Sequence, residues 1–397
     1  MKTGRLNAAN HPVSPEGVLD RVRSFGDLID KSAAADEAAT EVSPEVVETL
    51  IDAGIFKLMV PRDLGGMEAH PELLVDVLSE ISYHDGSTGW YSGAVMTAGG
   101  VSGALLGERA ISAIFGSGES TLAAGQAAPG GKAERIGDSY RVSGLFSFGS
   151  GAPTARWIVG GYVLHEKGAP VLNEGGEPVM LIGFVPRSTV ELLGNWNALG
   201  LRGTASYDFR VHEQILHEDF LFDPASAQVR RGGTLYRMGF MALPCLTHAA
   251  FAVGCARRAL DEWRDFAKAK KRGGNVYANE LQTFQRDFAM AHAELRSAEA
   301  YVRRTFSSLF DAAQAGDIDD DLKIDGRLCA SHALAVGNKV AQMAYTSCTT
   351  HALRSGNAIQ RSFRDLQAGN AHFLTGEQSW IDAGKVLAQL PGARIVF

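Results

Sequence analysis

The sequence of 397 residues lacks several features that define large classes of proteins. It contains four cysteines and no C-x-x-C pair, so it predicts neither a zinc ribbon nor a thioredoxin-type redox motif. No apolar run reaches the roughly 18 residues of a membrane-spanning helix, and no apolar core follows the first charged residues as in a secretion signal. The formal net charge of −7 opposes a dominant surface for nucleic acid. We therefore expect a cytoplasmic protein with buried, reduced cysteines and with neither nucleic acid nor a membrane among its partners.

Short functional motifs are missing as well. The sequence has no G-x-x-x-x-G-K-[ST] loop, no G-x-G-x-x-G after a strand, no G-x-S-x-G turn and no H-E-x-x-H pair. His212 and the run His217–Asp219 are the nearest approach to a ligand cluster, but they follow a β-prone run and predict a surface loop without a metal. Any cofactor site must therefore be assembled from dispersed residues.

Glycine is abundant, at 45 of 397 residues, and the chain divides into three zones of different texture. Residues 1–117 predict helices, because apolar residues recur at three- and four-residue spacing. Residues 118–226 carry short β-prone runs between glycines and prolines, which is typical of a small barrel or sandwich. Residues 227–397 predict a bundle of long, alanine-rich helices.

The expected helices have recognisable starts and stops. In the first zone, an apolar stripe begins at Val18, a second helix has Ser43 as N-cap and Pro44 at its first position, a third starts near Pro71, and a fourth follows Asp85. The last zone predicts four helices over 249–271, 280–312, 331–353 and 376–390, the first of them ended by Gly273 and Gly274.

Five stretches of sequence, in order and spacing, resemble the acyl-CoA dehydrogenase fold. They are residues 60–66, 85–90, 142–151, 199–206 and 361–366, the last followed by His372. The third and last stretches are most similar to its flavin-dependent monooxygenase branch, which includes the oxygenase component of 4-hydroxyphenylacetate hydroxylase and dibenzothiophene monooxygenase. The resemblance implies an α+β fold: an N-terminal helical domain (1–117), a central β-barrel or sandwich (118–226) and a C-terminal four-helix bundle (227–397).

The resemblance implies flavin contacts for Phe148 and Ser150, counted from the shared Gly144. An aromatic ring can pack on the isoalloxazine face, and a serine hydroxyl can donate or accept one hydrogen bond near N5. In a monooxygenase this hydroxyl would also steady a C4a-hydroperoxide. The alternative is that Phe-Gly-Ser-Gly is only a turn after a strand.

The region after Arg364-Asp365 distinguishes the branches. Many dehydrogenases place a base glutamate several residues beyond this dipeptide, but here Phe373 occupies that position, His372 precedes it, and Glu377 comes four residues later. Without a carboxylate there, abstraction of an α-proton from an acyl thioester has no base. A histidine can instead take a proton from a substrate or hold the distal oxygen of the peroxide. The alternative role for His372 is a helix cap.

The resemblance places Trp90, Met96 and Phe373 in the substrate pocket, with a core role as the alternative for Trp90. Related phenol hydroxylases often carry a histidine at the far end of the helix that starts near Trp90. Here residues 96–100 contain none, which favours a bulky, apolar or heteroaromatic ligand over a simple phenol.

Weaker similarities concern the rest of the flavin. Gln126 and the following alanines loosely match the flavin-contacting strand. Arg272 and Gln285 stand where the dehydrogenases reach the FAD pyrophosphate of a neighbouring subunit, and an arginine can pair with phosphate. The alternative for both is a solvated helix face. If they do reach the flavin, the site spans two chains of a homotetramer.

The sequence thus predicts the oxygenase component of a two-component monooxygenase. Reduced FMN or FAD, supplied by a separate NAD(P)H-dependent flavin reductase, would react with O₂ to give a C4a-hydroperoxyflavin that hydroxylates an aromatic or heteroaromatic substrate. His372 and Ser150 are the expected catalytic residues. The alternatives are an acyl-CoA dehydrogenase with a glutamate from elsewhere, an N- or S-oxygenase, and a non-catalytic flavin-binding relative.

Overall fold

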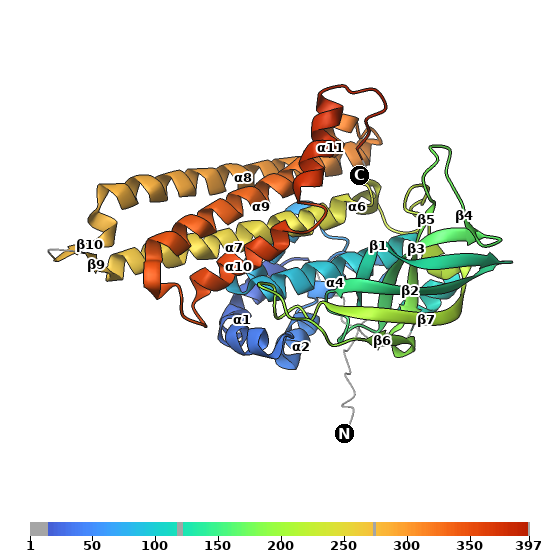
Figure 1. The fold of residues 1–397 in the computed structure, drawn as a ribbon, viewed down its shortest axis with the longest axis horizontal. Helices are drawn as coiled ribbons and strands as arrows, with labels where there is room; N and C mark the ends of the chain where they lie inside the picture. Colours follow the sequence, from blue (N-terminus) through green and yellow to red (C-terminus); the bar gives the residue numbers. More distant parts are fainter. Residues whose placement is uncertain (1–14, 117–121, 273–274, 396–397) are drawn as a thin grey trace, which may run out of the picture.

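The computed structural model describes residues 15–116, 122–272 and 275–395. The chain begins with helices that pack beside a sheet and against the C-terminal helices (Figure 1). They are α1 (Val18–Ala39), α2 (Pro44–Asp52), α3 (Pro71–His84), α4 (Gly86–Leu105) and α5 (Glu108–Phe115). The first four are confirmed and α5 was not predicted. Ser43 occupies the N-cap of α2 without a capping bond, whereas Asp85 caps α4 by accepting hydrogen bonds from the amide and hydroxyl of Thr88 at 2.8 and 2.9 Å.

The middle of the chain folds into one mixed sheet rather than two. Its path runs β6-β7-β2-β1-β3-β5-β8, with β4 beside β3, and the end strands β6 and β8 do not pair with each other within the described residues. Strands β1 and β3 are parallel and the other pairs are antiparallel. The strands are β1 (Ala123–Ile136), β2 (Ser139–Gly149), β3 (Trp157–Glu166), β4 (Ala169–Pro170), β5 (Met180–Pro186), β6 (Val190–Leu192), β7 (Tyr207–His217) and β8 (Leu221–Phe222).

Strand β1 is irregular where it meets the cavity described below. Its register with β3 shifts twice between Gln126 and Gly131. This bulge packs closely on β3, because a Cβ on Gly161 would lie 2.2 Å from the carbonyl oxygen of Ala127 and 2.5 Å from that of Ala128. Glycine is therefore required at 161 if the bulged backbone is to remain where it is.

The C-terminal helices form a bundle of α7, α8, α9 and α10, in which α7 contacts the other three. The elements are α6 (Thr234–Arg237), α7 (Ala242–Ala269), a short hairpin of β9 (Lys271–Arg272) and β10 (Val276–Tyr277), α8 (Gln282–Ala315), α9 (Asp320–Cys348), α10 (Ala358–Asn370) and α11 (Glu377–Leu387). The expected stop at Gly273-Gly274 lies outside the described residues. The prediction for 376–390 identified α11, which packs on α9, whereas α10 completes the bundle.

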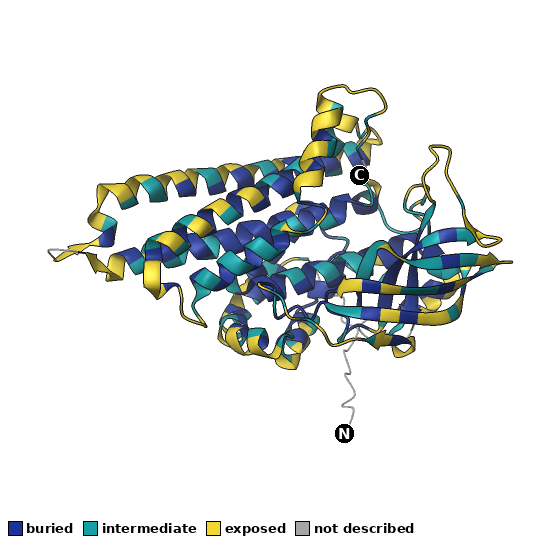
Figure 2. Ribbon diagram, viewed as in Figure 1, coloured by how far each residue is buried: buried dark blue, intermediate teal, exposed yellow. Residues whose placement is uncertain are grey.

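One hydrophobic core joins the three zones (Figure 2). Helix α7 lies at its centre, since it packs against α3 and α4 as well as against the bundle. All four cysteines are buried and unpaired, which confirms the expectation that they are small core residues. In the described ranges we find no helix with the length and apolar character that crossing a membrane requires.

Candidate active site

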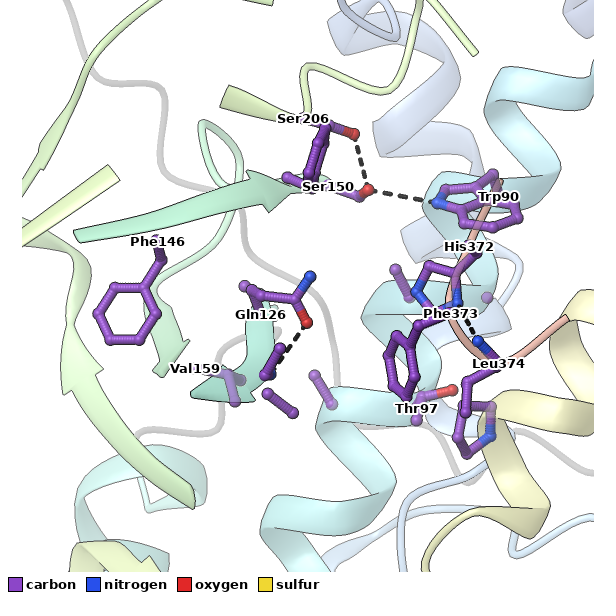
Figure 3. A pocket seen from close by; sticks show the side chains of 18 of the residues that line it. Trp90, Thr97, Gln126, Phe146, Ser150, Val159, Ser206, His372, Phe373 and Leu374 are labelled. Carbon is purple, nitrogen blue, oxygen red and sulfur yellow. Dashed lines mark hydrogen bonds between the residues drawn. The ribbon is translucent and has the colours of Figure 1, made fainter. Parts of the chain in front are cut away.

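A cavity of about 700 Å³ lies between the sheet, α4, the start of α7 and the segment after α10 (Figure 3). Its size falls in the range of about 300–1,000 Å³ that is typical of small-molecule sites. All three zones of the chain contribute to its wall. Among the described residues that line it there is no aspartate, glutamate, lysine or arginine.

A chain of hydroxyl groups fixes Ser150 in this wall. The Thr204 hydroxyl donates to the carbonyl oxygen of Leu201 at 2.8 Å, so it accepts from Ser206 at 2.6 Å. Ser206 in turn accepts from Ser150 at 2.7 Å, and Ser150 accepts from the indole N–H of Trp90 at 3.3 Å. A hydroxyl has one proton and two lone pairs. Ser150 therefore has one lone pair left and can only accept a hydrogen bond from a ligand.

Two histidines with opposite hydrogen-bonding polarity lie against Trp90. The Nδ1–H of His248, on α7, donates to the carbonyl oxygen of Pro244, which leaves a lone pair on Nε2. The Nδ1 of His372 accepts from the amide of Leu374 at 3.3 Å, so the neutral ring carries its proton on Nε2. The ring centroids of His248 and His372 are 4.5 Å apart. The centroid of Trp90 lies 4.5 Å from that of His248 and 5.6 Å from that of His372.

Both histidines are neutral. Burial lowers the pKa of His248 to about 4, because a charged imidazolium is poorly solvated there. Burial also holds the pKa of His372 well below its usual range, and the neighbouring His248 adds to this effect. The wall thus presents one acceptor, Nε2 of His248, and one donor, Nε2–H of His372.

Apolar side chains form the mouth of the cavity. Phe148 is 60% exposed and has a backbone φ of +65°, a conformation that a non-glycine residue adopts only when its surroundings impose it. Its carbonyl oxygen accepts a hydrogen bond from the amide of Ser150 at 2.9 Å, and its ring meets Trp196 edge-on at 6.2 Å. Phe373, on the opposite segment, is 54% exposed and also lines the cavity.

Two further polar side chains reach the cavity. Gln126 turns back on the bulge of β1, where its amide oxygen accepts from the backbone N–H of Ala128 at 3.1 Å. Thr97, on α4, has a buried hydroxyl with no hydrogen-bond partner among the described residues. An orphaned hydroxyl is costly in a dry interior, and it marks a place where a ligand or water can bind.

The expected place of Met96 is wrong. Met96 is fully buried and does not line the cavity. The cavity face of α4 instead carries residues at helical spacing from Trp90, namely Gly93, Ala94, Thr97, Ala98 and Val101. Because these side chains are small, they leave space for the cavity, which a side chain as large as that of Met96 would fill at the same positions.

The residues assigned to the flavin tail lie far from this cavity in the same chain. Arg272 is exposed in the β9–β10 hairpin at the far end of the bundle, where it donates to the carbonyl oxygen of Ser347 at 3.1 Å (Figure 1). Gln285 is exposed nearby and donates to the carbonyl oxygen of Asn279 at 3.2 Å. Only a second copy of the chain could bring them to a cavity, so their role remains a prediction.

No metal centre was found in the described part of the chain, where no group of three or more histidine, cysteine or acidic side chains converges. His212 lies in β7 rather than in a loop and pairs with the exposed Glu191 at 3.2 Å. His217 ends the same strand, and its Nδ1 accepts from the amide of Asp219 at 3.1 Å. These residues form surface contacts.

Three of the five motif stretches meet behind the cavity in a group of buried charges, Asp85, Arg361 and Asp365, which we call the charged cluster. Arg361 Nε lies 3.4 Å from Asp85 Oδ1, and Asp365 Oδ1 accepts from the amide of Leu201 at 2.6 Å. Burial raises the pKa of Asp85, and burial together with the charge of Asp85 raises that of Asp365 to about 7. The cluster therefore fixes the loop that leads to Ser206.

Sequence reasoning missed three of these residues. His248 immediately precedes the helix predicted over 249–271, and its only signal is that it is the single histidine in an apolar run. Ser206 and Thr204 belong to a stretch that was used for the resemblance but not for the site. A hydroxyl chain that joins residues 150 and 206 depends on strand pairing between β2 and β7, which short motifs do not reveal.

Known proteins resemble this chain along nearly its whole length. A family model described as acyl-CoA dehydrogenase, C-terminal domain, matches residues 246–377. The chain is 27% identical to an indole-3-acetate monooxygenase of Pseudomonas putida, covering 95% of this chain and 93% of the relative. It is also 27% identical to the oxygenase component of an FADH₂-dependent resorcinol hydroxylase of Rhizobium sp., covering 97% of each.

A solved structure shows the same fold. The 3-HSA hydroxylase from Rhodococcus sp. aligns with a TM-score of 0.88 at 22% identity, covering 95% of this chain and 97% of that one. A helical zone, a sheet and a helical bundle around one cavity thus define the acyl-CoA dehydrogenase fold. Within it, the chain is similar along most of its length to proteins named as monooxygenases and hydroxylases, one of them FADH₂-dependent.

Proposed function

We propose that this protein is the oxygenase component of a two-component system that takes reduced FMN or FAD from a separate flavin reductase and transfers one oxygen atom of O₂ to an aromatic substrate. The observation that carries the proposal is a cavity in which the acceptor Ser150 and the donor His372 share a wall that has no described carboxylate. The names of both relatives specify oxygenation of an aromatic compound, indole-3-acetate or resorcinol, and the name of the second also specifies dependence on FADH₂.

The described wall fits the ring system of a flavin. The ring of Phe148 and the exposed aliphatic side chain of Leu145 offer apolar surface at the sheet, and the bulge at Gln126 presents backbone polar groups. The free lone pair of Ser150 suits an N–H donor, and N5 of a flavin carries hydrogen in the reduced form only. This polarity favours the reduced cofactor.

The wall does not fit a phosphate, since no lysine or arginine lines it among the described residues. The phosphate tail must therefore extend out of the cavity. Arg272 and Gln285 of a second copy, in a homotetramer, are the residues that we propose to hold it, because both are exposed at the tip of the bundle.

The roles of the side chains follow from their hydrogen bonds. The bound reduced flavin supplies the two electrons with which one oxygen atom of O₂ leaves as water while the other enters the substrate. Trp90 holds Ser150 in place, and Ser150 accepts a hydrogen bond from the cofactor. The Nε2–H of His372 donates a hydrogen bond to oxygen. The apolar walls exclude water, which limits the loss of hydrogen peroxide.

The dehydrogenase alternative lacks its base in the described cavity. Glu377, the carboxylate that follows His372 in sequence, is exposed at the start of α11 and does not line the wall. Removal of an α-proton needs a base within hydrogen-bond reach of that proton.

The experiment is an incubation of the protein with NADH, a flavin reductase, FMN and a panel of aromatic compounds under ¹⁸O₂. We expect one ¹⁸O atom in a product, and its position will distinguish oxidation at carbon, nitrogen or sulfur. If the panel yields hydrogen peroxide alone, with and without the protein, the proposal is wrong. Reduction of bound FAD by an acyl thioester would favour the dehydrogenase alternative.

A further inference from the structure

The cavity holds a hydrogen-bond acceptor that the proposed reaction leaves unused. We propose that the Nε2 of His248 binds the N–H or O–H of the substrate, and that this substrate is an uncharged aromatic molecule. This inference rests on the proposed function, which places the oxygen chemistry beside His372. It assigns to His248 the recognition of one donor group and to the cavity wall the exclusion of charged groups.

The structure fixes the direction of this hydrogen bond. A carbonyl oxygen can only accept, so the contact between His248 Nδ1 and the Pro244 oxygen consumes the single proton of the neutral ring. Nε2 then keeps its lone pair, and within the described residues it has no hydrogen-bond partner. The ring cannot turn over without losing the bond to Pro244, which lies one helical turn earlier on α7.

Packing holds the ring at the cavity wall. Its centroid lies 4.5 Å from Trp90 in an edge-on contact, and 4.5 Å from His372 with an angle of 36° between the planes. Because His372 offers a hydrogen-bond donor and His248 an acceptor, the two rings can bind different groups. His372 faces the oxygen chemistry, and His248 is available to the substrate.

The wall also excludes charge. No described lining residue could neutralise a carboxylate or an ammonium group, and an unpaired ion in such an environment is strongly disfavoured. The orphaned hydroxyl of Thr97 adds a second neutral polar group on the facing helix. A flat aromatic molecule with one or two neutral polar groups satisfies both, whereas an arene that carries a carboxylate does not.

The test measures binding by calorimetry without oxygen, with saturating reduced FMN present so that the flavin part of the cavity is filled. The probes are indole and 2-naphthol, each paired with its methylated form, 1-methylindole or 2-methoxynaphthalene, and indole-3-acetate. In wild type we expect indole-3-acetate to bind at least about 30-fold more weakly than indole. In His248→Phe we expect the Kd of indole and 2-naphthol to rise about tenfold. The Kd of the methylated probes should change less than about twofold.

The controls separate recognition from folding. His248→Gln keeps an acceptor and should restore part of the affinity, and His332→Phe makes the same change outside the cavity, where the ring packs on Tyr301. Equal losses for donor and methylated probes in His248→Phe would overturn the proposal. So would tight binding of indole-3-acetate, or no binding of either donor probe. Failure of reduced FMN to bind would instead count against the proposed function.

Discussion

The charged cluster and part of the cavity wall come from the same three segments but have opposite chemistry. Helix α4 places Asp85 in the cluster and Trp90, little more than a turn later, in the cavity. Helix α10 carries Arg361 and Asp365 at one end and leads to His372 at the other. The buried charges of these segments thus lie in the cluster, where Arg361 pairs with Asp85 and Asp365 fixes backbone, while the described cavity wall contains neutral groups only.

This separation has a physical advantage. A fixed charge in the cavity would draw in water, and water allows reduced flavin and O₂ to yield hydrogen peroxide without product. Paired charges behind the wall hold the loops in place without this effect, although each pair is costly to bury. The cluster should therefore control stability, and the cavity should control the fate of oxygen.

Removing the arginine of the charged cluster should have the largest effect. Arg361→Leu removes the cation that pairs with buried Asp85 and leaves Asp365 with Arg364 as its nearby cation, so we expect the free energy of unfolding to fall by about 3–5 kcal/mol. Urea denaturation measures this difference. Lys385→Ala, which breaks an exposed pair with Asp382, is the control and should change stability little. A loss in Arg361→Leu no larger than in this control would contradict the role of the cluster.

The second effect is a dependence of stability on pH. The pKa of Asp365 rises from its ordinary value of 3.8 to about 7 in the folded protein, because the carboxyl is buried and lies near Asp85. Between these values the folded state binds more protons than the unfolded state, so the free energy of unfolding falls as the pH rises and levels off above about 7.

Asp365→Asn removes this proton and keeps an acceptor for the amide of Leu201. Relative to wild type, the variant should therefore gain stability as the pH rises from about 4 to about 7. Urea denaturation at intervals across this range gives the difference. Parallel curves for the two proteins would show that Asp365 has an ordinary pKa.

The smallest effect concerns one hydrogen bond in the cavity. Ser150→Ala removes the acceptor of Trp90 and, in our proposal, of the reduced cofactor, so the yield of oxygenated product should fall about tenfold. Product can be measured by mass spectrometry with chemically reduced FMN. Ser147→Ala changes a nearby serine of the same wall and should have little effect. Equal yields from the two variants would mean that Ser150 does not contact the cofactor.

Local signals in the sequence were sufficient for most of the fold. The helix start at Pro44, the strand from Trp157 and the long helix around Cys255 all follow from caps, alternation or apolar spacing, and the structure confirms them. The sequence indicated α10 as one of the stretches that resemble the fold and not as a helix, because its apolar stripe is short and interrupted by Arg361 and Arg364. The single sheet could not be inferred, since pairing depends on contacts between distant strands.

For the site, the sequence indicated which segments come together, but it did not indicate where each of their side chains points. Trp90, Ser150 and His372 do converge on one cavity. The predicted place of Met96 is wrong because the direction of the side chain rotates by about 100° with each residue along a helix. An error of one residue is therefore enough to point a side chain away from the cavity. His248 was missed because nothing local distinguishes a core histidine from one that faces a cavity.

The most direct test of the account is the division of oxygen between product and hydrogen peroxide. Wild type, His372→Phe and Asp365→Asn should be mixed at pH 7 with reduced FMN, O₂ and an aromatic substrate found in the ¹⁸O₂ experiment. We predict that Asp365→Asn keeps the wild-type ratio of product to peroxide, whereas His372→Phe converts most of the reduced flavin to peroxide. A wild-type ratio in His372→Phe, or an equal loss in both variants, would contradict the division between a catalytic cavity and a supporting charged cluster.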